Sequence, residues 1–96
     1  MKLLAIGDVV GKLGRSTVTK VLPQLRIDYG INLVVANGEN AASGKGITTS
    51  TAKELLEAGV DVISSGNHIW AQREAYSLLE SEMPILRPLN YPPGAP

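Results

Sequence analysis

The chain of 96 residues contains no cysteine. Disulfides and thiolate metal ligands are therefore excluded, and a reducing cytosol is the natural setting, so we predict a cytoplasmic protein. The formal net charge is zero, which provides no strong general footprint for nucleic-acid binding. No apolar run approaches the roughly 18 residues that a membrane span requires. These absences favour a globular protein with no membrane partner.

The composition is that of a folded protein, with 44% hydrophobic and 19% charged residues. The length suits one small domain. Two features nevertheless predict that residues 1–96 form an incomplete domain. Residues 90–96 read as a turn or linker, and the predicted strands are apolar on both faces, which requires covering layers above and below the sheet.

Apolar runs of strand length alternate with helical patterns along the chain. Strands are predicted at 2–6, 33–36 and 60–63, with a short fourth at 84–86. Helices are predicted at 15–28, 48–58 and 71–81. In the first helix Val18, Val21, Leu22 and Leu25 form the apolar stripe, and Pro23 is expected to bend or split it. Thr48 or Thr49 can cap the second helix, and Gly59 can end it.

This alternation predicts an α/β fold with a mostly parallel sheet flanked by helices. Parallel strands share one carboxyl edge, and ligands bind outside that edge. Three polar clusters follow the first three strands: Gly7-Asp8, Asn37-Gly38-Glu39-Asn40 and Gly66-Asn67-His68. The sequence therefore predicts that carboxylate, amide and imidazole groups converge there.

Each cluster has a structural alternative. Asp8 suits a metal ligand and a helix cap equally. Glu39 can bridge two cations and Asn40 can add a neutral oxygen, although both also fit a polar loop. The single His68 can donate a proton to a leaving oxygen, but a lone histidine more often has only a structural role. Trp70 either packs under its loop or stacks on a substrate.

The glycines near the N-terminus do not match a nucleotide-binding loop. The spacing of Gly7, Gly11 and Gly14 fits neither G-x-G-x-x-G nor G-x-x-x-x-G-K-[ST], because Leu13 follows Lys12. We interpret them as turn formers, with Gly14-Arg15 opening the first helix and facing a phosphate.

Four motifs, in order and in spacing, resemble the YmdB-like family of calcineurin-like metallophosphoesterases. They are Ile6–Gly11, Asn37–Ala42 with Gly44–Gly46, Gly66–Trp70 and Arg87–Pro92. The resemblance covers the whole chain and implies the N-terminal part of a metallophosphoesterase α/β/β/α sandwich. Residues 1–96 would then be a single partial domain whose C-terminal half is absent. It also implies a phosphodiesterase that acts on phosphodiesters including cyclic nucleotides, through a two-metal centre and an activated hydroxide.

The resemblance also implies residue roles. Asp8 would bind one metal, Glu39 would bridge both, Asn40 would join the first and Asn67 the second. His68 would be the catalytic proton donor. Two divalent or mixed-valence ions are expected, iron or manganese first, with magnesium or zinc as alternatives.

Two departures from the family pattern limit this expectation. Ala71 stands where the family usually has Asp, and the family's further histidines lie beyond position 96. We therefore expect the 96-residue chain alone to be inactive. The alternative is a non-catalytic nucleotide-binding or self-associating α/β fragment, which would form a homo-oligomer.

Overall fold

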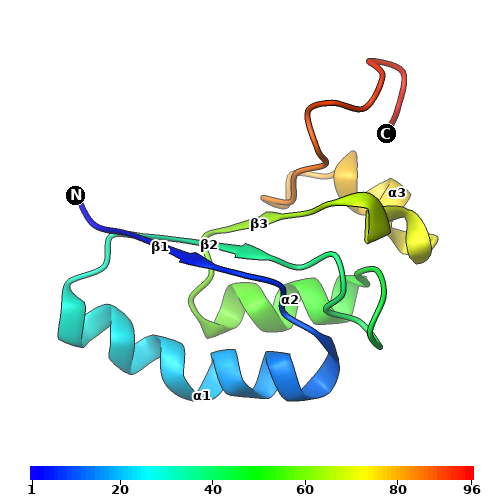
Figure 1. Cartoon of the computed structure of the whole chain (residues 1–96). Coiled ribbons are helices and arrows are strands. Elements are labelled where there is room, and N and C mark those ends of the chain that lie inside the picture. The colour runs from blue at the N-terminus through cyan, green and yellow to red at the C-terminus, as the bar shows by residue number, and fades with distance from the viewer.

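Three parallel strands form the sheet in the computed structural model, which describes all of residues 1–96 (Figure 1). They lie in the order β1-β2-β3, and the register pairs Leu3 with Leu33 and Val35 with Val62. The strands are β1 (Leu3–Ile6), β2 (Leu33–Asn37) and β3 (Val62–Ser64). The helices are α1 (Gly11–Tyr29), α2 (Thr49–Ala58), the 3-10 helix η1 (Asn67–Ala71) and α3 (Glu74–Leu79). The α/β class and the parallel sheet are thus confirmed.

The predicted fourth strand is reduced to one parallel bridge between Ile63 and Ile85. Two backbone hydrogen bonds hold it: Ile63 N–H donates to the Pro84 carbonyl at 2.8 Å, and Leu86 N–H donates to the Ile63 carbonyl at 2.9 Å. The third strand begins two residues later than predicted, at Val62. The segment predicted as a fourth strand therefore contributes one bridge at the β3 edge of the sheet and no full strand.

Helix α1 begins at Gly11, four residues before its predicted start, so the interpretation that Gly14-Arg15 opens it is wrong. No side chain caps its N-terminus. Instead, Gly11 has a left-handed φ of 59° and its N–H donates to the Asn40 carbonyl at 3.0 Å. A contact distant in sequence therefore sets this helix start, which explains why no local cap signal marks it.

The helix is continuous through Pro23, and its ribbon bends near the middle (Figure 1). The stripe was predicted correctly at Val18 and Leu22, which are buried, but Val21 is exposed. Helix α2 follows its prediction closely. The Thr48 side chain accepts a hydrogen bond from the Thr51 N–H, and Gly59 ends the helix with a φ of 118°.

The predicted helix over 71–81 is wrong in its first turn. Residues 67–71 form the 3-10 helix η1, and α3 begins only at Glu74. Gln72 between them is extended, with φ −106° and ψ 130°. It packs against Gly46, where a Cβ atom would lie 2.6 Å from the Gln72 Cγ. This close approach holds Gln72 out of a continuous helix.

The core lies between the sheet and helices α1 and α2, which cover the same face (Figure 1). Leu22, Val34, Leu55 and Ile63 are fully buried there. On β1 the alternate side chains are uncovered, and Leu3 is 59% exposed. The expected covering layers are therefore present on one face only. Neither α1 nor any other helix has the length and apolarity needed to cross a membrane.

Candidate functional site

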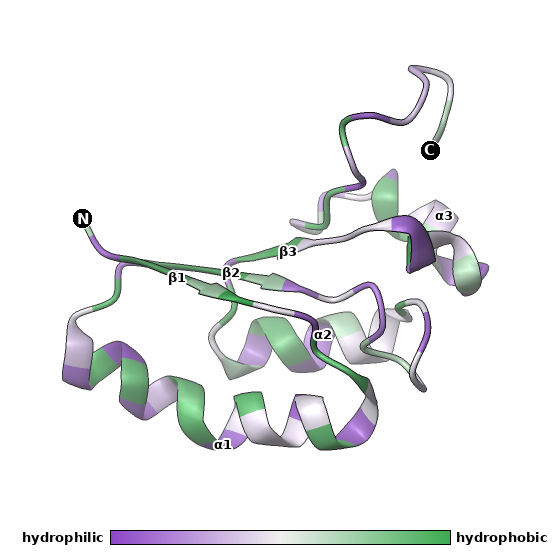
Figure 2. Cartoon of the chain, viewed as in Figure 1, coloured by the Kyte–Doolittle hydropathy of each residue, from purple (hydrophilic) through white to green (hydrophobic).

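The segments that follow the three strands meet at one edge of the sheet. Figure 2 shows mostly hydrophobic strands in green, with purple, hydrophilic segments beyond their carboxyl ends. Backbone hydrogen bonds join these segments. The Val9 N–H donates to the Asn37 carbonyl at 3.0 Å, and the Gly38 N–H donates to the Ser64 carbonyl at 2.9 Å. The predicted convergence at the carboxyl edge is therefore present in the fold.

Asn40 lies at the centre of the polar cluster and is only 7% exposed. Its Nδ2 donates to both carboxylate oxygens of Asp8, at 3.0 and 2.9 Å. Its Oδ1 lies 2.7 Å from Nδ1 of His68. The Asn40 amide thus bridges the first and third clusters. Asp8 does not cap α1, so the cap interpretation of this residue is wrong.

Glu39 is held by contacts with His68 and with Asn37. Its Oε2 accepts the backbone N–H of His68 at 2.9 Å, and the His68 Nδ1 lies 3.7 Å from the same oxygen. Its Oε1 accepts the Asn37 Nδ2 at 3.2 Å, while its own N–H donates to the Asn37 Oδ1 at 3.1 Å. The carboxylate is therefore oriented by both flanking segments.

The hydrogen-bond network determines which nitrogen of His68 faces outward. Asn40 donates through Nδ2 to Asp8, so its Oδ1 is an acceptor and the His68 Nδ1 must donate to it. The second ring nitrogen, Nε2, remains available to a ligand. In the doubly protonated ring this nitrogen is a donor, and in the neutral ring it is an acceptor.

The residue at position 66 must be glycine for Glu39 to occupy its place. A Cβ atom on Gly66 would lie 2.2 Å from Oε1 and 2.8 Å from Cδ of Glu39. No side chain fits that space without displacing the carboxylate. In the sequence this glycine is only part of a motif, whereas the fold explains why no larger residue fits there.

Asn67 is the one predicted site residue that the structure does not bring into the network. It is exposed and makes no side-chain hydrogen bond to Asp8, Glu39 or Asn40. No three His, Asp or Glu side chains lie close enough to form a metal cluster by themselves. A metal ion here would therefore need amide oxygens as well as the two carboxylates.

Arg15 supports the site in a way that its sequence position did not reveal. Its Nη1 donates to the carbonyl oxygens of Ala41 and Ala42, both at 2.6 Å, directly after Asn40. Its Nε donates to Glu54 of α2 at 2.7 Å. The expectation that Arg15 faces a phosphate is wrong, because its guanidinium is used to hold the loop that carries Glu39 and Asn40.

Comparisons with known proteins identify the family of the chain. A model of the family described as YmdB-like protein matches residues 4–96. A 2',3'-cyclic-nucleotide 2'-phosphodiesterase of Bacillus subtilis (strain 168) is 41% identical over 96 residues, which are 100% of this chain and 36% of the relative. The chain therefore spans about a third of the length of this relative.

Two solved structures have the same fold over this length. A hypothetical protein from Thermus thermophilus is 53% identical, with a TM-score of 0.93 over 100% of this chain and 37% of that one. A novel phosphatase from Mycoplasma pneumoniae is 38% identical, with a TM-score of 0.89 over 96% of this chain and 33% of that one. The chain superposes on part of each structure.

Proposed function

Because the chain belongs to the YmdB-like family, we propose that it forms one wall of the active site of a metal-dependent phosphodiesterase. Its substrates would be phosphodiesters, cyclic nucleotides among them, in line with the name of the Bacillus subtilis relative. The observation that supports this most directly is the network joining Asp8, Asn40, His68 and Glu39 at the carboxyl edge of the sheet.

The donor set fits hard divalent cations. Asp8 and Glu39 supply carboxylate oxygens, and Asn40 and Asn67 supply amide oxygens, which suit manganese, iron and magnesium. We assign Asp8 to one ion, Glu39 to both, Asn40 to the first and Asn67 to the second. Such a pair of ions, when bound, neutralises phosphate charge and lowers the pKa of a bound water.

Ligation would require a rearrangement within the network. The Asn40 Oδ1 now accepts from His68 and its Nδ2 donates to Asp8. To share a cation with Asp8, the Asn40 amide must turn its oxygen toward the carboxylate. Asn67, which is exposed, is free to turn toward the same region.

His68 would transfer a proton to the leaving oxygen of the substrate. When the Asn40 oxygen turns toward a cation, its Nδ2 would face the His68 Nδ1, which now contacts the Oδ1. The ring would remain engaged by Asn40, and Nε2, which would carry the proton, would be the nitrogen that meets the substrate. Its backbone N–H donates to Glu39, which ties the main chain of His68 to that carboxylate. Oriented general acids of this kind typically contribute about 10²–10⁴-fold to the rate.

We expect the 96-residue chain alone to bind a divalent ion weakly and to lack turnover. Two carboxylates and two amide oxygens are a weak donor set, and the one imidazole is assigned to proton transfer. Activity is expected in a protein that extends to the length of the relatives.

The test uses that extended protein and bis-(p-nitrophenyl) phosphate with Mn²⁺ or Fe²⁺. Turnover should be lost in Asp8→Ala and in Glu39→Ala. Asp28→Ala is the matched control, because Asp28 bonds only Gln24 on the exposed side of α1. Unchanged turnover in both site variants would refute the assignment.

A second candidate is a non-catalytic chain that associates with itself. The uncovered side of β1 and its unpaired edge favour this, since exposed strand edges and apolar faces promote pairing. Size-exclusion chromatography of the 96-residue chain distinguishes the two. A folded monomer that binds Mn²⁺ would contradict self-association.

A further inference from the structure

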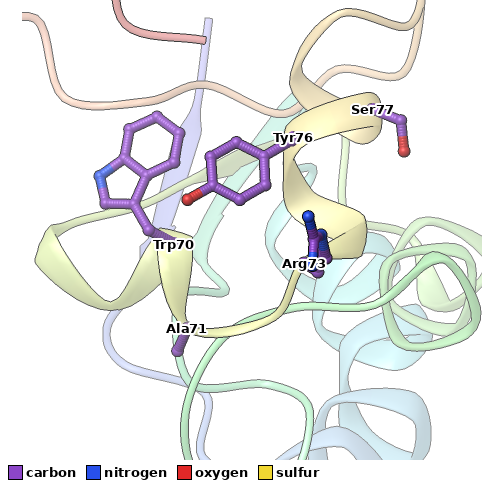
Figure 3. Close-up of a pocket in the computed structure, with 5 residues that line it drawn as sticks. All are labelled: Trp70, Ala71, Arg73, Tyr76 and Ser77. Carbon is purple, nitrogen blue, oxygen red and sulfur yellow. The ribbon is translucent and has the colours of Figure 1, made fainter.

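A cavity of about 670 Å³ lies beside the 3-10 helix that carries His68. Five residues line it: Trp70, Ala71, Arg73, Tyr76 and Ser77 (Figure 3). Its volume lies within the range of roughly 300–1,000 Å³ that is usual for small-molecule sites, and the cavity is open to solvent. None of the five residues belongs to the network of Asp8, Asn40, His68 and Glu39.

Aromatic rings form one wall of this cavity. The Trp70 and Tyr76 rings are stacked, with centroids 5.6 Å apart and planes at 28°. Tyr91 meets the Trp70 ring edge-on at 5.5 Å, which fixes the indole from a second direction. Tyr76 remains 43% exposed. Figure 3 shows the two rings side by side, one from η1 and one from α3. This wall is a rigid platform of the kind on which nucleobases stack.

An arginine side chain without a partner in the chain also lines this cavity. Arg15, Arg26 and Arg87 each donate hydrogen bonds within the chain. Arg73, the remaining arginine, is exposed, and its side chain has neither an ion-pair nor a hydrogen-bond partner within the chain. A free guanidinium next to aromatic rings suits a phosphate, which it can bind through two parallel N–H groups. The neighbouring Ala71 adds no negative charge that would oppose an anion.

The cavity is close to the proposed site along the chain. His68 and Trp70 are in the same 3-10 helix, and a rise of about 2.0 Å per residue separates them by roughly 4 Å along its axis. We propose that this cavity is a subsite for a nucleoside monophosphate unit, whose base stacks on the exposed Tyr76 ring of the Trp70–Tyr76 pair and whose phosphate pairs with Arg73. This subsite rests on the proposed function, and it specifies phosphodiesters flanked by a nucleotide as the substrate class.

The single tryptophan makes the test specific. Trp70 fluorescence of the 96-residue chain is titrated with adenosine 5'-monophosphate (AMP), adenosine and ribose 5-phosphate in buffer with EDTA. AMP should quench the fluorescence saturably and bind more tightly than either part alone. Tyr76→Ala should weaken AMP binding by about 5- to 160-fold, the loss of one stacking partner. Tyr29→Ala, an exposed tyrosine at the other end of the fold, is the matched control.

Two further variants test the phosphate contact. Arg73→Gln should weaken binding of AMP but leave that of adenosine unchanged, and Ala71→Asp should do the same by repulsion. All variants are at exposed positions, and circular dichroism verifies their folding. The proposal is overturned if AMP causes no saturable quenching up to about 1 mM, the upper end of usual KM values. It is equally overturned if Tyr76→Ala binds AMP as the wild type does.

The experiment separates this proposal from the proposed function, because EDTA removes any metal. AMP binding together with no phosphodiesterase activity in the extended protein would support the subsite and refute the function. Activity that depends on Asp8, without AMP binding, would support the function and refute the subsite.

Discussion

Replacing Arg15 by lysine tests whether one side chain holds the loop that carries Glu39 and Asn40. The arginine side chain is 15% exposed and makes three hydrogen bonds, to two carbonyl oxygens and to Glu54. A lysine ammonium keeps the charge but lacks the planar fork that reaches all three acceptors together. At least one partly buried carbonyl therefore loses its partner.

The magnitude follows from those contacts. A hydrogen bond to a charged group contributes about 1.5–3 kcal/mol, and the half-exposed ion pair contributes at most about 1 kcal/mol. We expect Arg15→Lys to lower the free energy of unfolding by about 2 kcal/mol. In a domain of this size that corresponds to a fall in Tm of roughly 8–16 °C.

Arg26→Lys is the matched control, because Arg26 makes a similar clamp at the opposite end of the same helix. It donates to the carbonyls of Gly59 and Asn32 and to Asp61, at 2.7, 3.1 and 2.7 Å. Both variants should lower Tm by a comparable amount. Only Arg15→Lys should accelerate hydrogen exchange at the amides that follow Asn40.

Thermal unfolding followed by circular dichroism measures the first effect, and native-state hydrogen exchange measures the second. The Ala41 and Ala42 amides report on the loop, since they donate to the Gly38 and Gly46 carbonyls at 3.1 and 3.0 Å. If both lysine variants accelerate these two amides equally at a temperature where both are folded, Arg15 has no special hold on the loop and the reasoning fails.

Two further outcomes test the site and the fold. Gly66→Ala should displace the Glu39 carboxylate, because the new Cβ would lie 2.2 Å from its Oε1. The affinity for Mn²⁺, measured by calorimetry, should fall by about tenfold or more, as when a metal site loses supporting contacts. Gly94→Ala is the control and should bind Mn²⁺ as the wild type does, because nothing lies within 4 Å of that position. The hydrogen bond from Arg26 lowers the pKa of Asp61, so its charged form stabilises the fold above the unfolded pKa of about 3.9, and the contribution fades as the pH falls below that value. Asp61→Asn should therefore lower Tm at neutral pH, and the difference from the wild type should shrink in acid; a constant difference would show that ionisation is not its source.

Much of the fold was predictable because its signals are local. The apolar runs predicted the strands, and their alternation with helices predicted a parallel sheet. Thr48 and Gly59 marked the ends of α2 because a cap and a left-handed glycine act within one turn of the helix. The start of α1 was missed because it depends on the Asn40 carbonyl, 29 positions away from Gly11. The first turn of the third helix was missed because Gly46 fits closely against Gln72.

For the candidate site, the sequence by itself determined the chemistry that is available. It places carboxylate, amide and imidazole groups after successive strands, and parallel strands end at a common edge. Tertiary structure alone decided which groups meet. It placed the Asn40 amide between Asp8 and His68, left Asn67 outside the network and turned Arg15 toward the loop. The physical reason is that residue type and spacing determine local conformation, whereas the hydrogen-bond partners of a side chain depend on packing between segments about 30 residues apart.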